Sequence, residues 1–174
     1  MYAQIKCMTI IKAREFILRP IRVTDAQGYL ECHEDEDAKA NFSSVPTTLE
    51  ESKKELHEGK KHNKKFAIIV KEKFAGFINL ELTTHPRYKH SAIVGYGIHK
   101  DFRGMGLATK ALKKITEYGF KELKLKRISG MCRTFNKASA KVLEKAGYVH
   151  EGTLHKNKFS NGKYLDDMIW AKWK

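Results

Sequence analysis

The sequence predicts a single α+β domain in which strands and helices alternate along the chain. Short runs of β-branched and aromatic residues recur from end to end, and two amphipathic helical patterns lie between them in the C-terminal half. The chain has 174 residues, of which 41% are hydrophobic, enough for one domain with a substantial core. We find no repeat, low-complexity tract or linker, so we expect residues 1–174 to form one unit.

The first predicted elements are a strand and a helix. Residues 15–22 (EFILRPIR) are apolar and rich in β-formers, which predicts a strand. Thr24 and Asp25 follow it, and their side-chain oxygens can cap a helix that runs into an acidic segment. The N-terminal part of the chain therefore begins strand, then helix.

A short surface helix and a pair of strands come next. Thr48 and Glu51 fit a capping box, and the polar segment that they begin ends at Gly59. Residues 65–70 (KFAIIV) and 74–82 (FAGFINLEL) are separated only by a charged turn, so they are expected to pair as antiparallel strands.

The C-terminal half alternates strand and helix before it ends. Residues 92–98 (AIVGYGI) predict a strand, and apolar residues at helical spacing over 107–123 predict a long helix after it. Residues 127–134 predict another strand, and a helix with its apolar face over 138–146 stops at Gly147. A tight loop at 103–106 therefore joins a strand directly to the long helix.

The remaining residues predict a hairpin. Asn161 and Gly162 both tolerate positive φ and form a strong turn signal. They lie between two strand candidates, residues 148–159 and 164–173. We therefore expect two long antiparallel strands at the end of the chain.

Composition limits the binding partners and the cellular compartment that we expect for this protein. Thirty-four Lys and Arg against twenty Asp and Glu give a formal net charge of +14, which attracts polyanions such as RNA, ribosomes or phosphorylated cofactors, although a merely solvated basic surface fits equally. No secretory signal and no apolar stretch of about 18 residues occurs, so we expect a cytoplasmic protein without membrane contact. Cys7, Cys32 and Cys132 are far apart and have no metal or disulfide spacing, which predicts reduced thiols and no metal site.

The loop before the long helix carries the clearest chemical signal. Two glycines in Arg103-Gly-Met-Gly-Leu-Ala-Thr109 lie where a strand gives way to a helix, so backbone N–H groups can approach an anion closely. The helix dipole and the Arg103 guanidinium add positive potential. A P-loop would need GxxxxGK[ST], and a dinucleotide fingerprint would need a third glycine; neither is present. A purely structural turn is the alternative for a lone GxG.

Two further segments make the loop more specific. The pattern RxxGxA at residues 103–108, together with NKASAKVLEKAGYVHEG at 136–152 and FSNGKYLDDMIWA at 159–171, resembles the GNAT acetyltransferases. The similarity is closest to the branch that contains the ribosomal-protein N-terminal acetyltransferases RimJ and RimL. It extends from about Phe16 to the end of the chain.

The resemblance implies a fold, a cofactor and a set of binding residues. The fold is a curved, mostly antiparallel sheet of about seven strands with flanking helices, in which two central strands splay apart to hold acetyl-CoA. Backbone groups at the end of one splayed strand pair with the pantetheine arm, the glycine loop takes the pyrophosphate, and an asparagine contacts the pantetheine side. In this sequence these residues are Tyr96, Gly97, Ile98, Arg103, Gly104, Met105, Gly106, Leu107, Ala108, Thr109 and Asn136.

The proton donor departs from the common family pattern. Acetyl transfer to an amine needs a neutral amine, a polarised thioester carbonyl and a proton for the leaving thiolate. Many relatives carry a tyrosine donor where this chain has Glu144. The likeness to RimL implies Ser139 as the group near the leaving sulfur. The alternative is that Ser139 only caps the helix at its N-terminus.

The sequence offers several candidates for the general base, the group that takes the proton from the amine. The glutamate that RimL-like enzymes carry before the last turn aligns with Lys158 here. Glu81 is our candidate to relay a proton through water, against the alternative of a solvated strand carboxylate; His85 and Asp167 are weaker candidates. Catalysis by positioning, with bulk water taking the proton, is the remaining reading.

Several acceptors and partners fit these patterns. We expect a primary amine acceptor, either a peptide N-terminus or a small molecule such as a polyamine or aminoglycoside. The acidic residues Glu31, Glu34, Asp35, Glu36 and Asp37 would attract a cationic amine, although such runs are often only solvated. The basic surface suits ribosome contact, and a homodimer is among the expected assemblies. A non-catalytic RNA-binding or ribosome-binding module is the alternative from another class.

Overall fold

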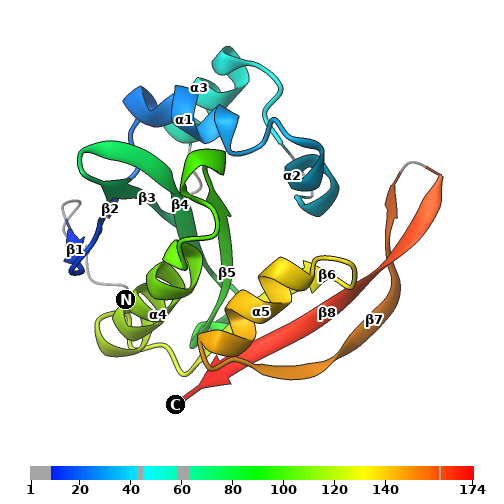
Figure 1. The fold of residues 1–174 in the computed structure, drawn as a ribbon. Coiled ribbons are helices and arrows are strands. Elements are labelled where there is room, and N and C mark those ends of the chain that lie inside the picture. Colours follow the sequence, from blue (N-terminus) through cyan, green and yellow to red (C-terminus); the bar gives the residue numbers. More distant parts are fainter. Residues whose placement is uncertain (1–8, 43–44, 59–62, 161) are drawn as a thin grey trace.

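The computed structural model describes residues 9–42, 45–58, 63–160 and 162–174. Strands and helices alternate as the sequence predicts (Figure 1). The strands are β1 (Ile11–Lys12), β2 (Ile17–Pro20), β3 (Asn63–Val70), β4 (Lys73–Leu82), β5 (Ser91–Ile98), β6 (Arg127–Arg133), β7 (Val149–Ser160) and β8 (Lys163–Trp173). The helices are α1 (Ala26–Glu31), α2 (Glu36–Asn41), α3 (Leu49–Glu58), α4 (Leu107–Lys121) and α5 (Lys137–Lys145), with 3₁₀ turns η1 (Val23–Asp25), η2 (Pro86–Tyr88) and η3 (Lys100–Phe102).

All the described strands belong to one open sheet. Its order is β1-β2-β3-β4-β5-β6-β8-β7, and within the described ranges every neighbouring pair is antiparallel except β5 and β6. The expected mixed, mostly antiparallel α+β architecture is confirmed. The sheet has eight strands rather than about seven, because the two-residue β1 pairs with β2 at the edge.

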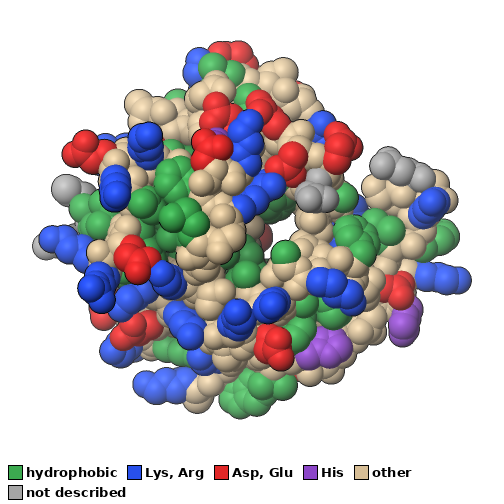
Figure 2. Space-filling model, viewed as in Figure 1, with side chains coloured by type: hydrophobic (Ala, Val, Ile, Leu, Met, Phe, Trp, Pro, Cys, Tyr) green, Lys and Arg blue, Asp and Glu red, His purple; other side chains and the backbone are tan. Residues whose placement is uncertain are grey.

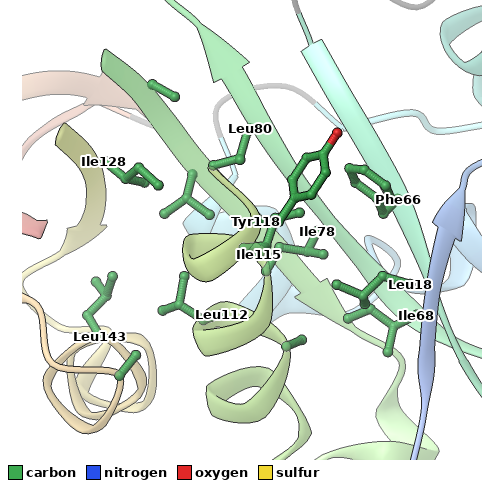
Figure 3. Close-up of a cluster of buried hydrophobic side chains, with 14 of the residues drawn as sticks. Leu18, Phe66, Ile68, Ile78, Leu80, Leu112, Ile115, Tyr118, Ile128 and Leu143 are labelled. Atoms are coloured by element: carbon green, nitrogen blue, oxygen red, sulfur yellow. The ribbon is translucent and has the colours of Figure 1, made fainter. Parts of the chain in front are cut away.

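The main core lies between α4 and the central strands. Apolar residues on one face of α4 contact the face of the sheet built from β2, β3, β4 and β6 (Figure 3). Spacing of three and four residues on α4 brings these side chains to one stripe, which is why the helical pattern predicted the core face. The buried residues labelled there are Leu18, Phe66, Ile68, Ile78, Leu80, Leu112, Ile115, Tyr118, Ile128 and Leu143.

A smaller apolar cluster covers the opposite face of the sheet. Tyr29 and Cys32 from α1 and its C-cap pack on Phe77 of β4, while the next residue, Ile78, belongs to the main core. This alternation follows from the two-residue period of a strand. Helices α1, α2 and α3 therefore lie on one side of the sheet, and α4 and α5 lie on the other (Figure 1).

Side-chain capping differs from the prediction at α1. Asp25 occupies the N-cap position, but its carboxylate makes no cap hydrogen bond. Instead, it accepts two hydrogen bonds of 2.7 Å from the Arg19 guanidinium and one of 2.8 Å from the Arg22 N–H. A bidentate Arg–carboxylate pair is stronger than a neutral cap bond, and it fixes the entry to α1.

The capping box of α3 is only half formed. The Glu51 N–H donates to the Thr48 hydroxyl at 3.1 Å, as predicted. The Glu51 carboxylate, however, accepts from the N–H and hydroxyl of Thr47, one residue earlier. Gly59, the predicted stop signal, lies outside the described residues.

Both predicted hairpins form. The β3–β4 turn places Lys71 and Glu72 at positive φ, at 45° and 65°. Gly162 has φ of 75° in the β7–β8 turn, whose other central residue, Asn161, lies outside the described residues. The second hairpin extends beyond the body of the sheet (Figure 1).

Candidate active site

The two parallel strands separate and open a cleft. Their pairing ends at Val94 and Gly130, while β5 continues to Ile98 and β6 to Arg133. A cleft of about 930 Å³ occupies this opening, lined by both strands, the α4 loop, α5 and residues of α2 and its C-cap. Figure 2 shows the molecule hollowed here, with Lys and Arg side chains along the rim over α5. The expected splay of two central strands is thus present.

The loop between η3 and α4 forms one end of the cleft. Gly104 and Gly106 have φ of 77° and 71°, a left-handed conformation that glycine adopts without strain. A Cβ added at either glycine would meet no atom within 4 Å, so the space beside the loop is open. Since the 15-residue α4 begins at Leu107, its positive end adjoins this space.

Arg103 is held from two directions at the edge of this loop. Its Nε donates to the Ile98 carbonyl at 3.0 Å, and its Nη2 lies 2.6 Å from the Asp35 carboxylate. Asp35 also caps α2, because its carboxylate accepts from the Ala38 N–H at 2.7 Å. Burial raises the pKa of Asp35, but the Ala38 N–H and the Arg103 guanidinium outweigh it and hold the pKa below its ordinary value. The Asp35 carboxylate is therefore charged at neutral pH.

Tyr96 and Ser139 meet across the cleft. The two hydroxyl oxygens lie 2.8 Å apart, and the Tyr96 hydroxyl is also 3.3 Å from the Ser139 carbonyl oxygen. Burial raises the pKa of Tyr96, so its phenol is protonated at neutral pH and can donate a proton. The Tyr96 side chain was not in our sequence-based prediction, which assigned this residue a role through its backbone only. The strand alternation of AIVGYGI did not reveal which way the ring points.

Asn136, not Ser139, caps α5. The Asn136 carboxamide oxygen accepts from the Ser139 N–H at 2.9 Å, which places Ser139 inside the first turn. The Ser139 hydroxyl is therefore left for Tyr96. Cys132 lies nearby as a buried thiol, and burial raises its pKa, so it is largely protonated at neutral pH.

Most of the predicted binding residues come together at the cleft. Met105 does not line it; 63% of its side chain is exposed. The structure brings the other predicted cofactor residues and one predicted catalytic residue to the cleft wall: Tyr96, Gly97, Ile98, Arg103, Gly104, Gly106, Leu107, Ala108, Thr109, Asn136 and Ser139.

Glu81 lies away from these residues. It pairs in register with Ile93 on β5, before the point where the strands part, and its side chain is exposed. It does not line the cleft. The cause is register: the part of β4 that pairs with β5 beyond Val94 is residues 76–79, which end before Glu81, so the position of Glu81 does not support the predicted role.

Arg133 lines the cleft, and it lies beside two residues that the sequence analysis considered for the general base, Asp167 and Lys158. Arg133 and Asp167 form a buried ion pair between β6 and β8, and the Asn157 amide donates to Asp167 at 2.8 Å. Lys158 donates to the Phe42 carbonyl at 3.1 Å, and burial and the Arg133 charge lower its pKa. A carboxylate inside the apolar strand LDDMIW was the available signal, since buried acids need partners.

The acidic segment is mostly engaged within the chain. Glu31 lies 3.0 Å from the His99 ring, Asp35 binds Arg103, and Glu36 lies 2.9 Å from Lys39. Glu34 is exposed, and the side chain of Asp37 lies outside the description. Three of the five carboxylates, those of Glu31, Asp35 and Glu36, therefore have partners within the chain.

Neither a metal-ligand group nor a membrane-spanning helix is found in the part of the chain that the structure describes. There, no group of three or more His, Cys, Asp or Glu side chains is arranged to hold a metal ion. Within the same ranges, no helix is long and apolar enough to cross a bilayer.

Comparison with known proteins decides the family. A model of the acetyltransferase (GNAT) domain matches residues 15–149. This chain belongs to the GNAT acetyltransferase family. A GNAT enzyme uses acetyl-CoA as acetyl donor, and the open glycine loop, the helix terminus and the cleft between splayed strands fit a long, phosphorylated cofactor.

Relatives of this GNAT domain cover more than nine-tenths of the chain. The probable N-acetyltransferase YjcK of Bacillus subtilis (strain 168) is 30% identical over 174 residues, covering 93% of this chain and 96% of YjcK. A GNAT-family acetyltransferase from Bacillus anthracis has a TM-score of 0.84 at 24% identity, covering 95% of this chain and 98% of that one. RimL, a ribosomal-protein acetyltransferase solved with coenzyme A, has a TM-score of 0.83 at 20% identity over 95% and 98% of the two chains. The two solved structures match this chain in fold.

Proposed function

We propose that this GNAT enzyme holds its cofactor across the cleft, with the pyrophosphate at residues 103–109 and the pantetheine arm along β5. Gly104 and Gly106 offer a backbone surface without side chains, and α4 adds its positive end. Beyond Val94, β5 has no β6 partner, so its backbone groups on that side can pair with an extended ligand. When bound, acetyl-CoA supplies the thioester that donates the acetyl group.

The observation that carries the catalytic proposal is the 2.8 Å contact between the Tyr96 and Ser139 hydroxyls. Each hydroxyl can donate one proton while accepting another, so the pair can hold a proton at the cleft wall and deliver it to a departing thiolate. Position 144 has no tyrosine, and Tyr96 supplies a phenol from the opposite side of the cleft. Tyr96, paired with Ser139, is therefore the proposed proton donor in place of a tyrosine at position 144.

Proton removal from the amine is assigned to solvent. Glu81 lies outside the cleft, and Asp167 is fully buried in its ion pair with Arg133. Lys158 occupies the place of the expected glutamate and binds Phe42. Bulk water accepting the proton agrees with these positions, and positioning of the amine then provides the main rate enhancement.

The proposed acceptor is the N-terminal amine of a protein. Three features support this choice: the net charge of +14 favours contact with ribonucleoprotein, the fold matches that of RimL, and the acidic segment is engaged within the chain. A polyamine would need free carboxylates near the cleft to offset the repulsion by this charge. A small-molecule amine of lower positive charge is the second candidate.

Assembly and location remain proposals of the same kind. Ribosome contact through the basic surface, a homodimer and a cytoplasmic location are what we expect for this enzyme. Sedimentation of the protein with and without purified ribosomes, at low and high salt, would measure the first two.

Calorimetric titration with acetyl-CoA, followed by thiol release in the same sample, tests the proposed function. The acceptor panel contains N-terminal peptides of ribosomal proteins, spermidine and an aminoglycoside. We expect acetyl-CoA to bind and peptides to drive thiol release. If only spermidine drives thiol release, the acceptor is a polyamine and not a protein N-terminal amine. If acetyl-CoA does not bind, the proposed cofactor site is refuted.

A further inference from the structure

One carboxylate connects the glycine loop to helix α2 on the other side of the cleft. Ala38 and Asn41 on α2 and Phe42 at its C-cap line the cleft, and we call these three residues the α2 wall. Asp35 lies just before this helix and contacts Arg103, the first residue of the glycine loop, at 2.6 Å. This ion pair joins the two sides of the cleft at this point.

The Asp35 carboxylate makes two contacts, one that caps α2 and one that holds Arg103. It accepts from the Ala38 N–H at 2.7 Å, which caps α2, and it pairs with the Arg103 guanidinium. Arg103 is fixed from the other direction by the Ile98 carbonyl at 3.0 Å. Because 40% of the Arg103 side chain is still exposed at the cleft wall, part of the guanidinium stays accessible to an anion.

We infer that Asp35 is a positioning residue that orients Arg103 toward the cofactor phosphates and anchors the α2 wall to the cofactor loop. This inference rests on the proposed cofactor site. Arginine loses much rotamer freedom when it is ordered, so a guanidinium held in place beforehand binds phosphate at lower entropic cost. The same contact sets the distance between the glycine loop and the wall that an acceptor must pass.

Electrostatic repulsion between Asp35 and the cofactor would change acetyl-CoA affinity in the opposite direction. Asp35 carries a negative charge close to the space for the pyrophosphate, and that charge alone would weaken anion binding. If repulsion dominated, removal of the charge would tighten acetyl-CoA binding. The direction of the change therefore distinguishes a positioning residue from a competitor for Arg103.

The variant Asp35→Asn separates the two partners. Asparagine is as good an N-cap as aspartate, so α2 keeps its cap while the charge toward Arg103 is lost. We expect the dissociation constant for acetyl-CoA to rise about twofold to fivefold, the size of one partly exposed ion pair. The KM for the acceptor should rise as well, with kcat little changed, because neither Asp35 nor Arg103 contacts Tyr96 or Ser139.

A matched control and a double variant complete the test. Glu36→Gln removes the same charge from the first turn of α2, but Glu36 contacts Lys39 and not Arg103, so acetyl-CoA affinity should stay at the wild-type value. In an Arg103→Met background, Asp35→Asn should weaken acetyl-CoA binding no further.

The outcomes separate this inference from the proposed function. If wild-type protein fails to bind acetyl-CoA in the calorimeter, the proposed cofactor site is wrong. If it binds and Asp35→Asn binds equally well or more tightly, the positioning role is overturned. A weakening that persists unchanged in the Arg103→Met background would also overturn it, because the effect would not pass through Arg103.

Discussion

The phenolic oxygen of Tyr96 lies 2.8 Å from the hydroxyl oxygen of Ser139, and this contact joins β5 to α5 across the cleft. If the pair delivers a proton, Tyr96→Phe and Ser139→Ala should each lower kcat on the order of 10²-fold, with little change in KM for acetyl-CoA. The double variant should be no slower than the slower single variant, because the two groups act as a unit. Thiol release at saturating substrates measures these rates.

Tyr164→Phe is the control for removal of a phenol. Tyr164 lies in the β7–β8 hairpin with 64% of its side chain exposed, outside the cleft. Its variant should keep the wild-type kcat. Wild-type turnover in both Tyr96→Phe and Ser139→Ala would rule out the proposed proton donor.

Gly104→Glu should abolish acetyl-CoA binding and leave the fold intact. Glutamate would fill the open space beside the loop and bring a negative charge to the phosphate position. Gly162→Glu is a matched control, because Gly162 has nearly the same φ, 75° against 77°, and equally open space. Calorimetry should show wild-type affinity for the control, and circular dichroism should show folded protein for both. Retained affinity in Gly104→Glu would place the pyrophosphate elsewhere.

Lys137, Lys141 and Lys145 form a positive stripe on the cleft side of α5. They recur every four residues, all three line the cleft, and no described carboxylate forms an ion pair with them. Their mutual repulsion is relieved by an anionic ligand. Lys141→Gln should therefore weaken acetyl-CoA binding about threefold, a loss of well under 1.4 kcal/mol, and reduce its salt dependence.

Lys113→Gln serves as the control for Lys141→Gln. Lys113 lies on α4 outside the cleft and is exposed. Titration at low and high salt should show that its affinity follows the wild type. Equal losses in both variants would mean that only the overall charge of the protein matters.

Stability in acid should depend on Glu55. Burial raises the pKa of this carboxyl, but hydrogen bonds from Lys65 at 2.6 Å and Tyr29 at 2.7 Å outweigh burial and hold the pKa below 4.5. A lowered pKa stabilises the fold above pH 4.5, and this contribution is lost as the pH falls through the folded value. Glu55→Gln should therefore unfold more easily at pH 7, and the difference should vanish in acid. Urea titrations at pH 7 and pH 3 would measure it, and an equal difference at both would contradict the assignment.

The sequence predicted elements well where local chemistry decides them. Strands β2 to β8, both hairpin turns and helices α4 and α5 follow from period and turn residues, and the glycine loop follows from its place between strand and helix. Contacts between segments far apart in the chain could not be predicted from the sequence. The Arg103–Asp35 and Tyr96–Ser139 contacts join residues 68 and 43 positions apart, and the packing of α2 and α5 on the sheet brings them together. The position of Glu81 outside the cleft depends on strand register, which the sequence does not reveal.

The brief parallel pairing of β5 with β6 has a consequence for how the protein responds to heat. Four residue pairs, from Ser91–Arg127 to Val94–Gly130, are the ladder contact between the first five strands and the last three. A ligand that fills the gap beyond these pairs contacts both parts of the sheet and holds them together. Acetyl-CoA at about 100 times its dissociation constant should add about 2.7 kcal/mol to the free energy of unfolding. A thermal melt can therefore rank cofactor analogues before any acceptor is known.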